Sequence, residues 1–557
     1  MRFEGFARYA LLGVLLLAGF LRLYQLSSNP PGLTWDEASL GYNAYSILKT
    51  GKDEYGNVFP LSIRSFDDYK PPVYVYFSVP FIALFGLNEF SVRFLSALAG
   101  WATVLATYFL VYELITSWRF IPQRKFQTHV SLIPLVSAFL VAISPWHLQF
   151  SRAAFEGNVG LFFLTAGIVG LIKGLNKPAV FLAGTMLLVF SMYSYHSFRV
   201  VTPLVVGMFS ILFWKDIQKN LKMISIGAVL GILLTIPIIL SFIMQSGAES
   251  RLSMVTIFSG HELLRNSIER LEYDRSQGDW LGVLIHNRRI EYLRIAAKGY
   301  LDHWDPLFLF IRGDGGRHHH ASDAGMLYLW ELPFILIGVI TLLFVRSKLN
   351  ILLLFWLLVA PIPSAITTGT PHAVRAIAMI PILHVLTAIG LVRVMIWIRQ
   401  MKKRTVQATL MVGIGGIVFM NVMYYFHQYY VHTPVEYGDF WQSANRELFE
   451  KLRMIEHRYE KIVITYHYDQ PYIYYLFFNK IDPSWYQNNW DTYQTGAVDR
   501  MYRRIGRYEF RNISWAVDKS LTSTLLVAAP EEIPKNTIAI DTVRFLNGEV
   551  AFYLINR

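Results

Sequence analysis

The sequence predicts a mainly α-helical protein that crosses a membrane many times and ends in a small α/β domain. Of its 557 residues, 54% are hydrophobic and only 16% are charged, whereas a soluble chain has roughly 25% charged residues. The apolar residues lie in uninterrupted runs of the length that a bilayer core requires. The C-terminal stretch is more polar, and amphipathic helical segments alternate there with strand-like ones.

The composition argues against cysteine chemistry and against binding to nucleic acid. The chain has no cysteine, so we expect no disulfide, thiolate nucleophile or cysteine-ligated metal. Its formal net charge is +12, and a basic chain can bind nucleic acid. The basic residues, however, gather at the ends of the apolar runs, as membrane topology requires. We therefore expect membrane lipids as partners and no nucleic acid.

Twelve apolar runs are candidate spans. They cover approximately residues 9–26, 72–87, 93–115, 130–147, 158–173, 178–195, 199–214, 222–244, 326–345, 349–366, 374–397 and 405–427. The run at 72–87 is the doubtful one, because it is short and begins after Pro71. It either spans the membrane or lies in the interface as an amphipathic or re-entrant helix.

The basic clusters decide between these alternatives. They are Arg2/Arg8, Arg119/Arg124/Lys125, Lys173/Lys177, Lys215/Lys219/Lys222, Arg346/Lys348 and Arg399/Lys402/Lys403/Arg404. With 72–87 in the interface, all of these clusters fall on one side, which is the cytoplasmic side. We therefore predict about eleven transmembrane helices, interfacial helices in the first outer loop and a cytoplasmic N-terminus, in the inner or plasma membrane.

The chain is predicted to divide into a membrane domain, residues 1–430, and an extracytoplasmic domain, residues 431–557. The membrane domain carries two long outer loops, 27–92 and 245–325. In the C-terminal domain the residue patterns predict helices at 447–459 and 470–478, and strands at 461–466, 524–529 and 550–555.

Two adjacent carboxylates, Asp36 and Glu37, lie a few residues after the first span. An aspartate at this place suits a general base that deprotonates an acceptor hydroxyl, and its neighbour suits a contact with a substrate or a cation. The alternative is structural, with Asp36 as a helix cap and Glu37 in the first turn. The dipeptide alone leaves both interpretations open.

Cationic residues lie on the same predicted outer side. Lys70 follows Asp68 and Tyr69 just before the 72–87 run, and lysine binds phosphate as a point charge. Arg375, close to His372 at the start of a later span, suits bidentate binding of phosphate. For both cations the alternative is a side chain that extends along apolar surface to reach the interface.

Two further pairs lie in outer loops. Arg152 and Glu156 are spaced i,i+4, which favours a structural ion pair and a functional role about equally. His196 and Arg199 lie beside aromatic residues of the kind that form an interfacial belt, and the role of both polar residues stays open.

The long outer loop ends with Gly313–Asp314–Gly315–Gly316–Arg317–His318–His319–His320. Consecutive histidines suggest zinc, but adjacent side chains point apart and the loop offers no partner at ligand spacing. The favoured interpretation is that Arg317 and His318 contact an anionic substrate, and a divalent metal stays undecided. Because all these motifs fall on one predicted side, we expect them to line one outward-facing cavity.

Several short motifs follow one another in a specific order. Asp36–Glu37 follows the first span, Asp68–Tyr69–Lys70–Pro71–Pro72 precedes the next apolar run, and Asn88–Glu89–Phe90–Ser91–Val92–Arg93 begins the span after it. Ser151–Arg152 with Glu156, and Pro371–His372 with Arg375, complete the set. In this order they resemble the GT-C glycosyltransferases, in the bacterial branch related to the protein O-mannosyltransferases and the aminoarabinose transferase of lipid A. The similarity covers roughly residues 1–430.

The resemblance implies an enzyme that moves a hexose or pentose from a polyprenyl-phosphate-linked donor to an acceptor glycan, lipid or protein, with inversion and outside the cytoplasm. It implies that Asp36 is the acidic catalytic residue, with Glu37 beside it, and that Lys70 and Arg375 contact the donor phosphate. The extra histidines after Arg317 depart from the family pattern. Two other functions stay open: a lipid or glycan transporter, which would carry ionisable residues at the membrane midplane, and a non-catalytic envelope-assembly protein.

Overall fold

The computed structural model describes residues 2–66, 68–118, 130–244, 256–258, 261–345, 347–491 and 502–557. The chain forms two compact units. Unit 1 consists of Met1–Leu21, Ala99–Phe150 and Gly157–Tyr425, and unit 2 consists of Arg22–Leu98, Ser151–Glu156 and Phe426–Arg557. The predicted cytoplasmic residues Arg119, Arg124, Lys125 and Arg346 lie outside the described residues.

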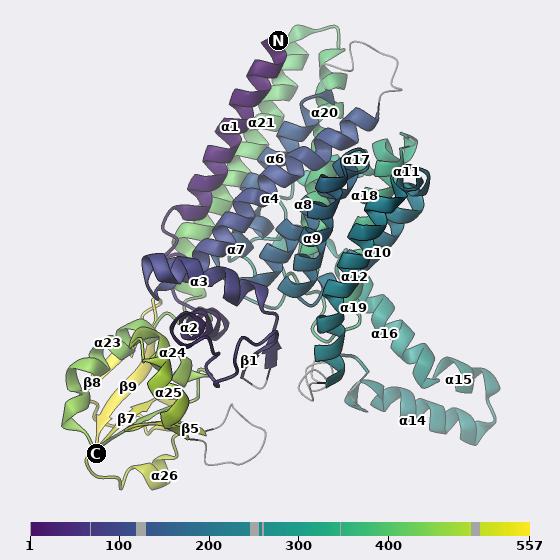
Figure 1. The fold of residues 1–557 in the computed structure, drawn as a ribbon. Coiled ribbons are helices and arrows are strands. Elements are labelled where there is room, and N and C mark those ends of the chain that lie inside the picture. Colours follow the sequence, from purple (N-terminus) through teal and green to yellow (C-terminus); the bar gives the residue numbers. More distant parts are fainter. Residues whose placement is uncertain are drawn as a thin grey trace. The chain divides into compact units, whose positions relative to one another are not determined.

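Unit 1 is a bundle of helices (Figure 1). Its elements are α1 (Arg2–Leu23), α4 (Glu89–Ser117), α6 (Ile133–Ile143), α7 (Pro145–Arg152), α8 (Glu156–Gly174), α9 (Pro178–Ser194), α10 (Phe198–Leu212), α11 (Trp214–Lys219), α12 (Leu221–Met244), α14 (His261–Gln277), α15 (Trp280–Ile285), α16 (Arg288–Asp302), a π-helical turn η1 (Leu307–Arg312), α17 (Glu331–Phe344), α18 (Lys348–Val359), α19 (Ile362–Ala365), η2 (Ile377–Met379), α20 (Ile380–Arg399) and α21 (Arg404–His427). Helices α1, α4, α7, α8 and α21 each contribute residues to both units.

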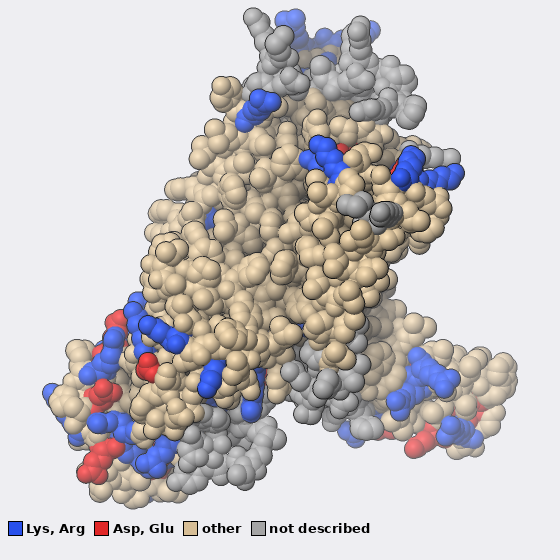
Figure 2. All heavy atoms as spheres, viewed as in Figure 1, with Lys and Arg blue, Asp and Glu red and all other residues tan. Residues whose placement is uncertain are grey.

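Five helices of the described chain are long and apolar enough to cross a membrane. They are Glu89–Ser117, Glu156–Gly174, Lys348–Ala365, Ile377–Arg399 and Arg404–Glu436. The pair Ile133–Ile143 and Pro145–Arg152, bent by 55°, makes a sixth if it is counted as one span. On the face drawn in Figure 2, residues other than Lys, Arg, Asp and Glu cover most of the middle of the unit 1 bundle. The chain is therefore a membrane protein, and the number of eleven spans stays a prediction.

Two glycines allow α17 and α20 of unit 1 to pack closely. A Cβ atom on Gly338 would lie 2.1 Å from the carbonyl oxygen of Leu386, and one on Gly390 would lie 2.0 Å from that of Phe334. In a membrane, small residues at such crossings let two helix backbones approach and gain van der Waals contact. This crossing therefore depends on the absence of side chains at both positions.

Unit 2 combines the first loop with the C-terminal part of the chain. The loop supplies α2 (Trp35–Thr50), β1 (Ile63–Ser65), β2 (Asp68–Lys70) and α3 (Val73–Phe85). The C-terminal part supplies η3 (Gln428–His432), α22 (Thr433–Glu436), α23 (Asn445–Ile455), η4 (Glu456–Arg458), β3 (Lys461–Ile464), α24 (Pro471–Phe478), α25 (Pro483–Asn489), β4 (Trp490–Asp491), β5 (Tyr502–Ile505), β6 (Tyr508–Arg511), α26 (Trp515–Asp518), β7 (Thr524–Ala528), η5 (Pro530–Glu532), β8 (Asp541–Arg544) and β9 (Val550–Asn556).

A mixed sheet forms the core of the C-terminal part, in the order β4-β5-β6-β3-β7-β9-β8. Strand β3 lies in the middle and pairs in parallel with β6 and β7, whereas the outer pairs are antiparallel. All five residues of β7 are buried, as expected for a central strand covered on both faces. The predicted strands at 461–466, 524–529 and 550–555 are confirmed, and the predicted helices at 447–459 and 470–478 match α23 with η4 and α24.

Helix α2 packs against elements from both parts of unit 2. Tyr42 Oη donates to the carbonyl oxygen of Ile481 at 3.0 Å, and Tyr474 Oη donates to that of Leu33 at 3.0 Å. These buried phenols tie the first loop to the C-terminal part. Helix α3 has only 13 residues, about 20 Å of helix against a hydrocarbon core of roughly 30 Å. Its length favours the interfacial interpretation of the 72–87 run.

Candidate functional site

At the start of α2, Asp36 lies at the surface and Glu37 lies in the interior of unit 2. Thr34 is the N-cap: its hydroxyl accepts from the amide of Glu37 at 3.2 Å, and the Glu37 carboxylate accepts from the amide of Thr34 at 3.1 Å. This reciprocal capping box satisfies two amides at the helix start. The structural alternative in which Asp36 is the cap is therefore wrong, because the cap lies two residues earlier.

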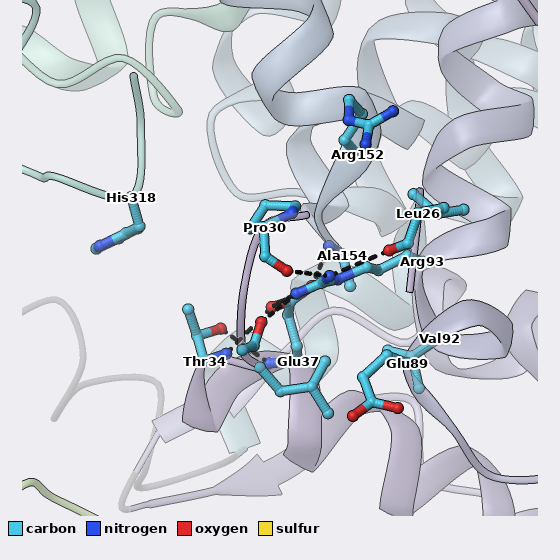
Figure 3. Close-up of polar contacts among 12 residues, drawn as sticks. Leu26, Pro30, Thr34, Glu37, Glu89, Val92, Arg93, Arg152, Ala154 and His318 are labelled. Carbon is cyan, nitrogen blue, oxygen red and sulfur yellow. Dashed lines mark hydrogen bonds and ion pairs between the residues drawn. The ribbon is translucent and has the colours of Figure 1, made fainter. Parts of the chain in front are cut away.

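Glu37 is held by an ion pair inside unit 2 (Figure 3). Its Oε1 accepts from Arg93 Nε at 2.9 Å and its Oε2 from Arg93 Nη2 at 3.2 Å, and the amide of Ala154 donates to Oε1 at 2.9 Å. Arg93 Nη1 also donates to the carbonyl oxygens of Leu26 and Pro30, at 3.2 and 2.8 Å. Both charges are buried, and a buried pair persists only with such complete hydrogen bonding. This arrangement locks the start of α2 in place.

Asp36, by contrast, reaches solvent. Its carboxylate lies 2.5 Å from Lys70 Nζ, and 56% of its side chain is exposed against 6% of that of Lys70. It occupies the first turn of α2, where the helix dipole stabilises a negative charge. The pair therefore combines an accessible carboxylate with a largely buried ammonium group.

The hairpin of β1 and β2 positions Lys70. The two strands pair antiparallel, with Ser65 opposite Asp68, Arg64 opposite Tyr69 and Ile63 opposite Lys70. Phe66 adopts a positive φ of 56° in the connection. Asp68 and Tyr69 lie two residues and one residue, respectively, before the buried Lys70 on the same strand.

Arg152 makes hydrogen bonds to other residues of unit 2. It is buried, donates from Nη2 to the carbonyl oxygens of Tyr24 and Asn29 at 2.7 and 2.9 Å, and donates from Nε to Tyr429 Oη at 3.0 Å. Glu156 is the first residue of α8. Arg152 therefore links the backbone at residues 24–29 to the side chain of Tyr429, which is distant in the sequence.

Unit 1 contains a second polar cluster, formed by the loop at 313–320 and the loop before α20. His319 Nδ1 lies 2.7 Å from Asp314 Oδ2, which also accepts from the amide of Ala373 at 2.7 Å. The amide of His372 donates to His303 Nε2 at 3.1 Å. Asp314, His319 and His372 each offer a ligand atom, and these atoms lie within 4.8 Å of one another. Sequence spacing within the loop did not reveal this set, because His372 comes from a different loop.

The three side chains suit a divalent metal. His372 Nδ1 is buried and makes no hydrogen bond with the described residues. Burial, followed by the charges of His319 and Arg375, lowers the pKa of His372 well below its ordinary value, so it is the neutral imidazole that metals bind. Burial alone would raise the pKa of Asp314, but His319 and the Ala373 amide bring it below its ordinary value. Tetrahedral zinc with bonds of about 2.0–2.2 Å separates its ligand atoms by about 3.4 Å, so a small closure would complete the site.

The other predicted residues of unit 1 lie in loops or, in the case of Arg199, in the first turn of a helix. Arg375 Nη1 donates to Thr367 Oγ1 at 2.6 Å and to the carbonyl oxygen of Thr368 at 2.9 Å. Arg317 is exposed and His318 is half-buried, next to the metal-ligand candidates. His196 and Arg199 lie where α9 passes into α10, and Arg199 Nε donates to the carbonyl oxygen of Met192 at 3.3 Å.

Each unit thus brings together a part of the predicted site. Unit 2 joins Asp36 with Lys70, and unit 1 joins Asp314, His319 and His372, with the ring of His318 against that of His319. Convergence of the two groups on one cavity stays a prediction. Sequence reasoning missed Arg93 as the partner of Glu37, although a charge within the first two turns of an apolar span was a signal for it.

The fold of this chain is similar to that of two solved ArnT structures, in agreement with the resemblance that the order of motifs indicated. The ArnT structure from Cupriavidus metallidurans in the apo state aligns with 100% of this chain and 98% of its own, with a TM-score of 0.52 and 11% identity. ArnT from the same organism bound to undecaprenyl phosphate gives a TM-score of 0.50 and 10% identity, over 98% of this chain and 97% of that one.

A third solved structure is more distant. The oligosaccharyltransferase of Archaeoglobus fulgidus, tethered to an acceptor peptide, gives a TM-score of 0.47 and 13% identity over 86% of this chain. This chain spans 63% of that protein's length. No family model and no curated protein matches the sequence.

Proposed function

We propose that this protein transfers a sugar from a polyprenyl-phosphate-linked donor to an acceptor hydroxyl at the extracytoplasmic face of the membrane, with inversion at the anomeric carbon. The observation that carries the proposal is the pair of Asp36 and Lys70, 2.5 Å apart at the start of α2. One partner is an accessible base and the other a cation for the leaving group. The fold shared with ArnT, one structure of which holds undecaprenyl phosphate, supports a lipid-linked donor.

In the proposed reaction Asp36 takes the proton of the acceptor hydroxyl. The acceptor oxygen attacks the anomeric carbon, and the bond from that carbon to the phosphate oxygen breaks. The electron pair leaves with the lipid phosphate, whose charge Lys70 stabilises. Lys70 would exchange its contact with Asp36 for the phosphate, which frees the carboxylate at the same step.

Glu37 has a different role in this proposal. Its two oxygens accept hydrogen bonds from Arg93 and from the amides of Thr34 and Ala154. It is a positioning residue that holds the first turn of α2, and thereby Asp36, against the hairpin that carries Lys70. A rigidly held base supports a higher reaction rate than a mobile one, because misplacement by about 1 Å can reduce a rate roughly 100-fold.

Unit 1 supplies the remaining proposed contacts. Arg375, Arg317 and His318 are proposed to bind the anionic part of the donor, and Asp68, Tyr69, Glu156, His196 and Arg199 remain candidates for the walls of the cavity. Asp314, His319 and His372 are proposed to hold a divalent metal, which when bound would add a local positive charge. The N-terminus is proposed to be cytoplasmic and residues 431–557 extracytoplasmic, on the strength of the basic clusters.

The test uses a deletion strain complemented with Asp36→Asn, and mass spectrometry of its envelope glycans and lipids. We expect the product that is lost on deletion to stay absent, at wild-type levels of folded protein. The matched control is Glu447→Gln, since Glu447 is a half-exposed acid of unit 2 that also pairs with a lysine, Lys451, at 3.1 Å. The control should restore the product.

Two outcomes would contradict the proposal. Near-wild-type product with Asp36→Asn would remove Asp36 from the catalytic role. If the variant that lacks Asp36, Lys70 and Arg375 together restored the envelope product fully, this would favour an assembly protein that performs no transfer. A transporter would instead leave the sugar–lipid bond intact and change only the side of the membrane on which the lipid-linked sugar accumulates.

A further inference from the structure

Helices α14, α15 and α16 form an arm that projects from the bundle of unit 1 (Figure 1). The helices pack against one another, and α16 packs against α19 at the base. The starts of α15 and α16 are capped locally: Asp279 accepts from the amide of Leu281, and Asn287 accepts from the amide of Arg289. The arm is therefore a defined helical structure, although much of its apolar surface is uncovered.

An apolar stripe runs along α16. Ile290, Leu293, Ala297 and Leu301 are spaced by three, four and four residues, which places them on one face of a helix. All four are exposed, Leu293 by 66% and Leu301 by 65%. The buried side of the same helix carries Gly299 instead. Among the described residues, no side chain covers this stripe.

The short helix α15 continues the apolar surface at the far end of the arm. Trp280 is 74% exposed, and Leu281, Leu284 and Ile285 are each about half exposed. Tryptophan with one apolar side and one hydrogen-bonding edge is enriched where a membrane meets water. A soluble surface rarely exposes so many large apolar side chains in one small element.

The other end of the stripe reaches a membrane-spanning segment. Tyr300 Oη donates to the carbonyl oxygen of Leu358 at 2.9 Å, and a Cβ atom on Gly299 would lie 2.6 Å from the carbonyl oxygen of Ala365. Both acceptors belong to the candidate span Lys348–Ala365. Leu358 itself is 55% exposed, so the helix that carries the stripe packs against a span that also has an uncovered apolar side chain.

Charged residues flank the stripe rather than interrupt it. Helix α16 carries four basic and two acidic residues, and both acids pair with cations of the same helix. Glu291 lies 2.5 Å from Arg294, and Asp302 lies 2.9 Å from Lys298. Long basic side chains beside an apolar face can place their charge among lipid phosphates while the stem stays in apolar surroundings.

We propose that the α14–α16 arm lies on the surface of the bilayer that the chain spans, with the stripe of α16 and the apolar side chains of α15 at the boundary of headgroups and acyl chains. The partner is phospholipid. A protein partner would have to match a narrow stripe on a helix that itself packs against a candidate membrane span. Lipid needs no such match, because it follows any apolar surface.

Lipid contact at the arm would also steady the polar cluster of unit 1. Helix α16 leads into His303, whose Nε2 lies 2.8 Å from Ser364 Oγ and accepts from the amide of His372. An arm anchored in the interface would hold this turn against the loop before α20. The inference does not depend on the proposed glycosyl transfer, since it uses only exposure, spacing and the contact with the span.

The chain offers a direct test because it has no cysteine. Single variants Leu293→Cys, Leu301→Cys and Lys298→Cys of the full chain are labelled with a nitroxide and placed in phospholipid nanodiscs at one chain per disc. The rate at which each nitroxide label collides with oxygen, which concentrates in lipid, is compared with its rate of collision with a water-soluble nickel complex. We expect oxygen to dominate at positions 293 and 301 and nickel at 298, where the native side chain is 71% exposed on the charged flank.

Three results would overturn the proposal. The labels at 293 and 301 could be as accessible to nickel as the label at 298, which would place the stripe in water. They could be shielded from both reagents at one chain per disc, which would mean that protein covers the stripe. Labels at 293 could also show spin–spin coupling only when discs hold two chains, together with loss of oxygen contact, which would identify a second copy as the occupant.

Discussion

The buried pair of Glu37 and Arg93 makes the sharpest stability prediction. Replacement of Glu37 by Gln keeps the shape of the side chain and a residue type that is accepted at this position of a capping box. It removes the charge that faces Arg93, whose guanidinium is fully buried. The change therefore tests the ion pair with little disturbance of the helix start.

The magnitude follows from the contacts. The Glu37 carboxylate accepts four hydrogen bonds, two of them from Arg93, whereas glutamine offers one acceptor oxygen and turns an NH2 group toward donors. Breaking a buried pair on one side costs about 3–5 kcal/mol. For a unit of 150–250 residues each kcal/mol lowers Tm by about 2–4 °C, so we expect Glu37→Gln to lower the Tm by roughly 10 °C.

The assay is thermal unfolding of the purified protein in one detergent, with Glu447→Gln as the exposed control. The control should change stability by less than about 0.5 kcal/mol. The double variant of Glu37→Gln with Arg93→Met should lose less than the sum of the single losses, because neither charge is then left buried alone. A Tm of Glu37→Gln within experimental error of wild type, or strict additivity in the double variant, would refute the reasoning.

Two other predictions concern unit 1. Asp314→Asn should lower the amount of zinc that copurifies with the protein, as measured by elemental analysis. The control is Asp323→Asn, because Asp323 lies in the same loop but outside the ligand set. Equal zinc in the two variants would contradict the metal site. Gly338→Val should destabilise the protein by about 1–3 kcal/mol, because its Cβ atom would overlap the carbonyl oxygen of Leu386, 2.1 Å away. Gly413→Val in α21, where a Cβ atom meets nothing within 4 Å, should leave the apparent Tm nearly unchanged, and a similar loss in both variants would show that the close crossing is not the cause.

Hydropathy and alternation were sufficient for the features that depend on local sequence. The length of an apolar run determines whether a helix can span a bilayer, and each of the five qualifying helices overlaps a run that the sequence marked. Strands β3, β7 and β9 are mainly apolar, so they were visible in the sequence. Strands β4, β5, β6 and β8 were not predicted, because each has at most four residues with charged residues among them, and this leaves little hydrophobic pattern.

The candidate site likewise combines features that the sequence predicted with features that only the structure showed. The sequence placed Asp36, Glu37 and Lys70 in one loop and favoured Asp36 as the base, but it did not identify the partner of Glu37. Only the fold shows that Glu37 pairs with Arg93 inside unit 2 and that Asp36 pairs with Lys70 at the surface. The set of Asp314, His319 and His372 likewise required two loops to meet.

The sequence by itself determined that this protein lies in a membrane and ends in an α/β region, because hydrophobic run length and strand alternation are local properties of the chain. The tertiary structure decided which charges are buried, which are paired and which remain accessible for chemistry. The physical reason is that burial and pairing depend on residues far apart in the sequence, such as positions 37 and 93, whose contact no local pattern encodes.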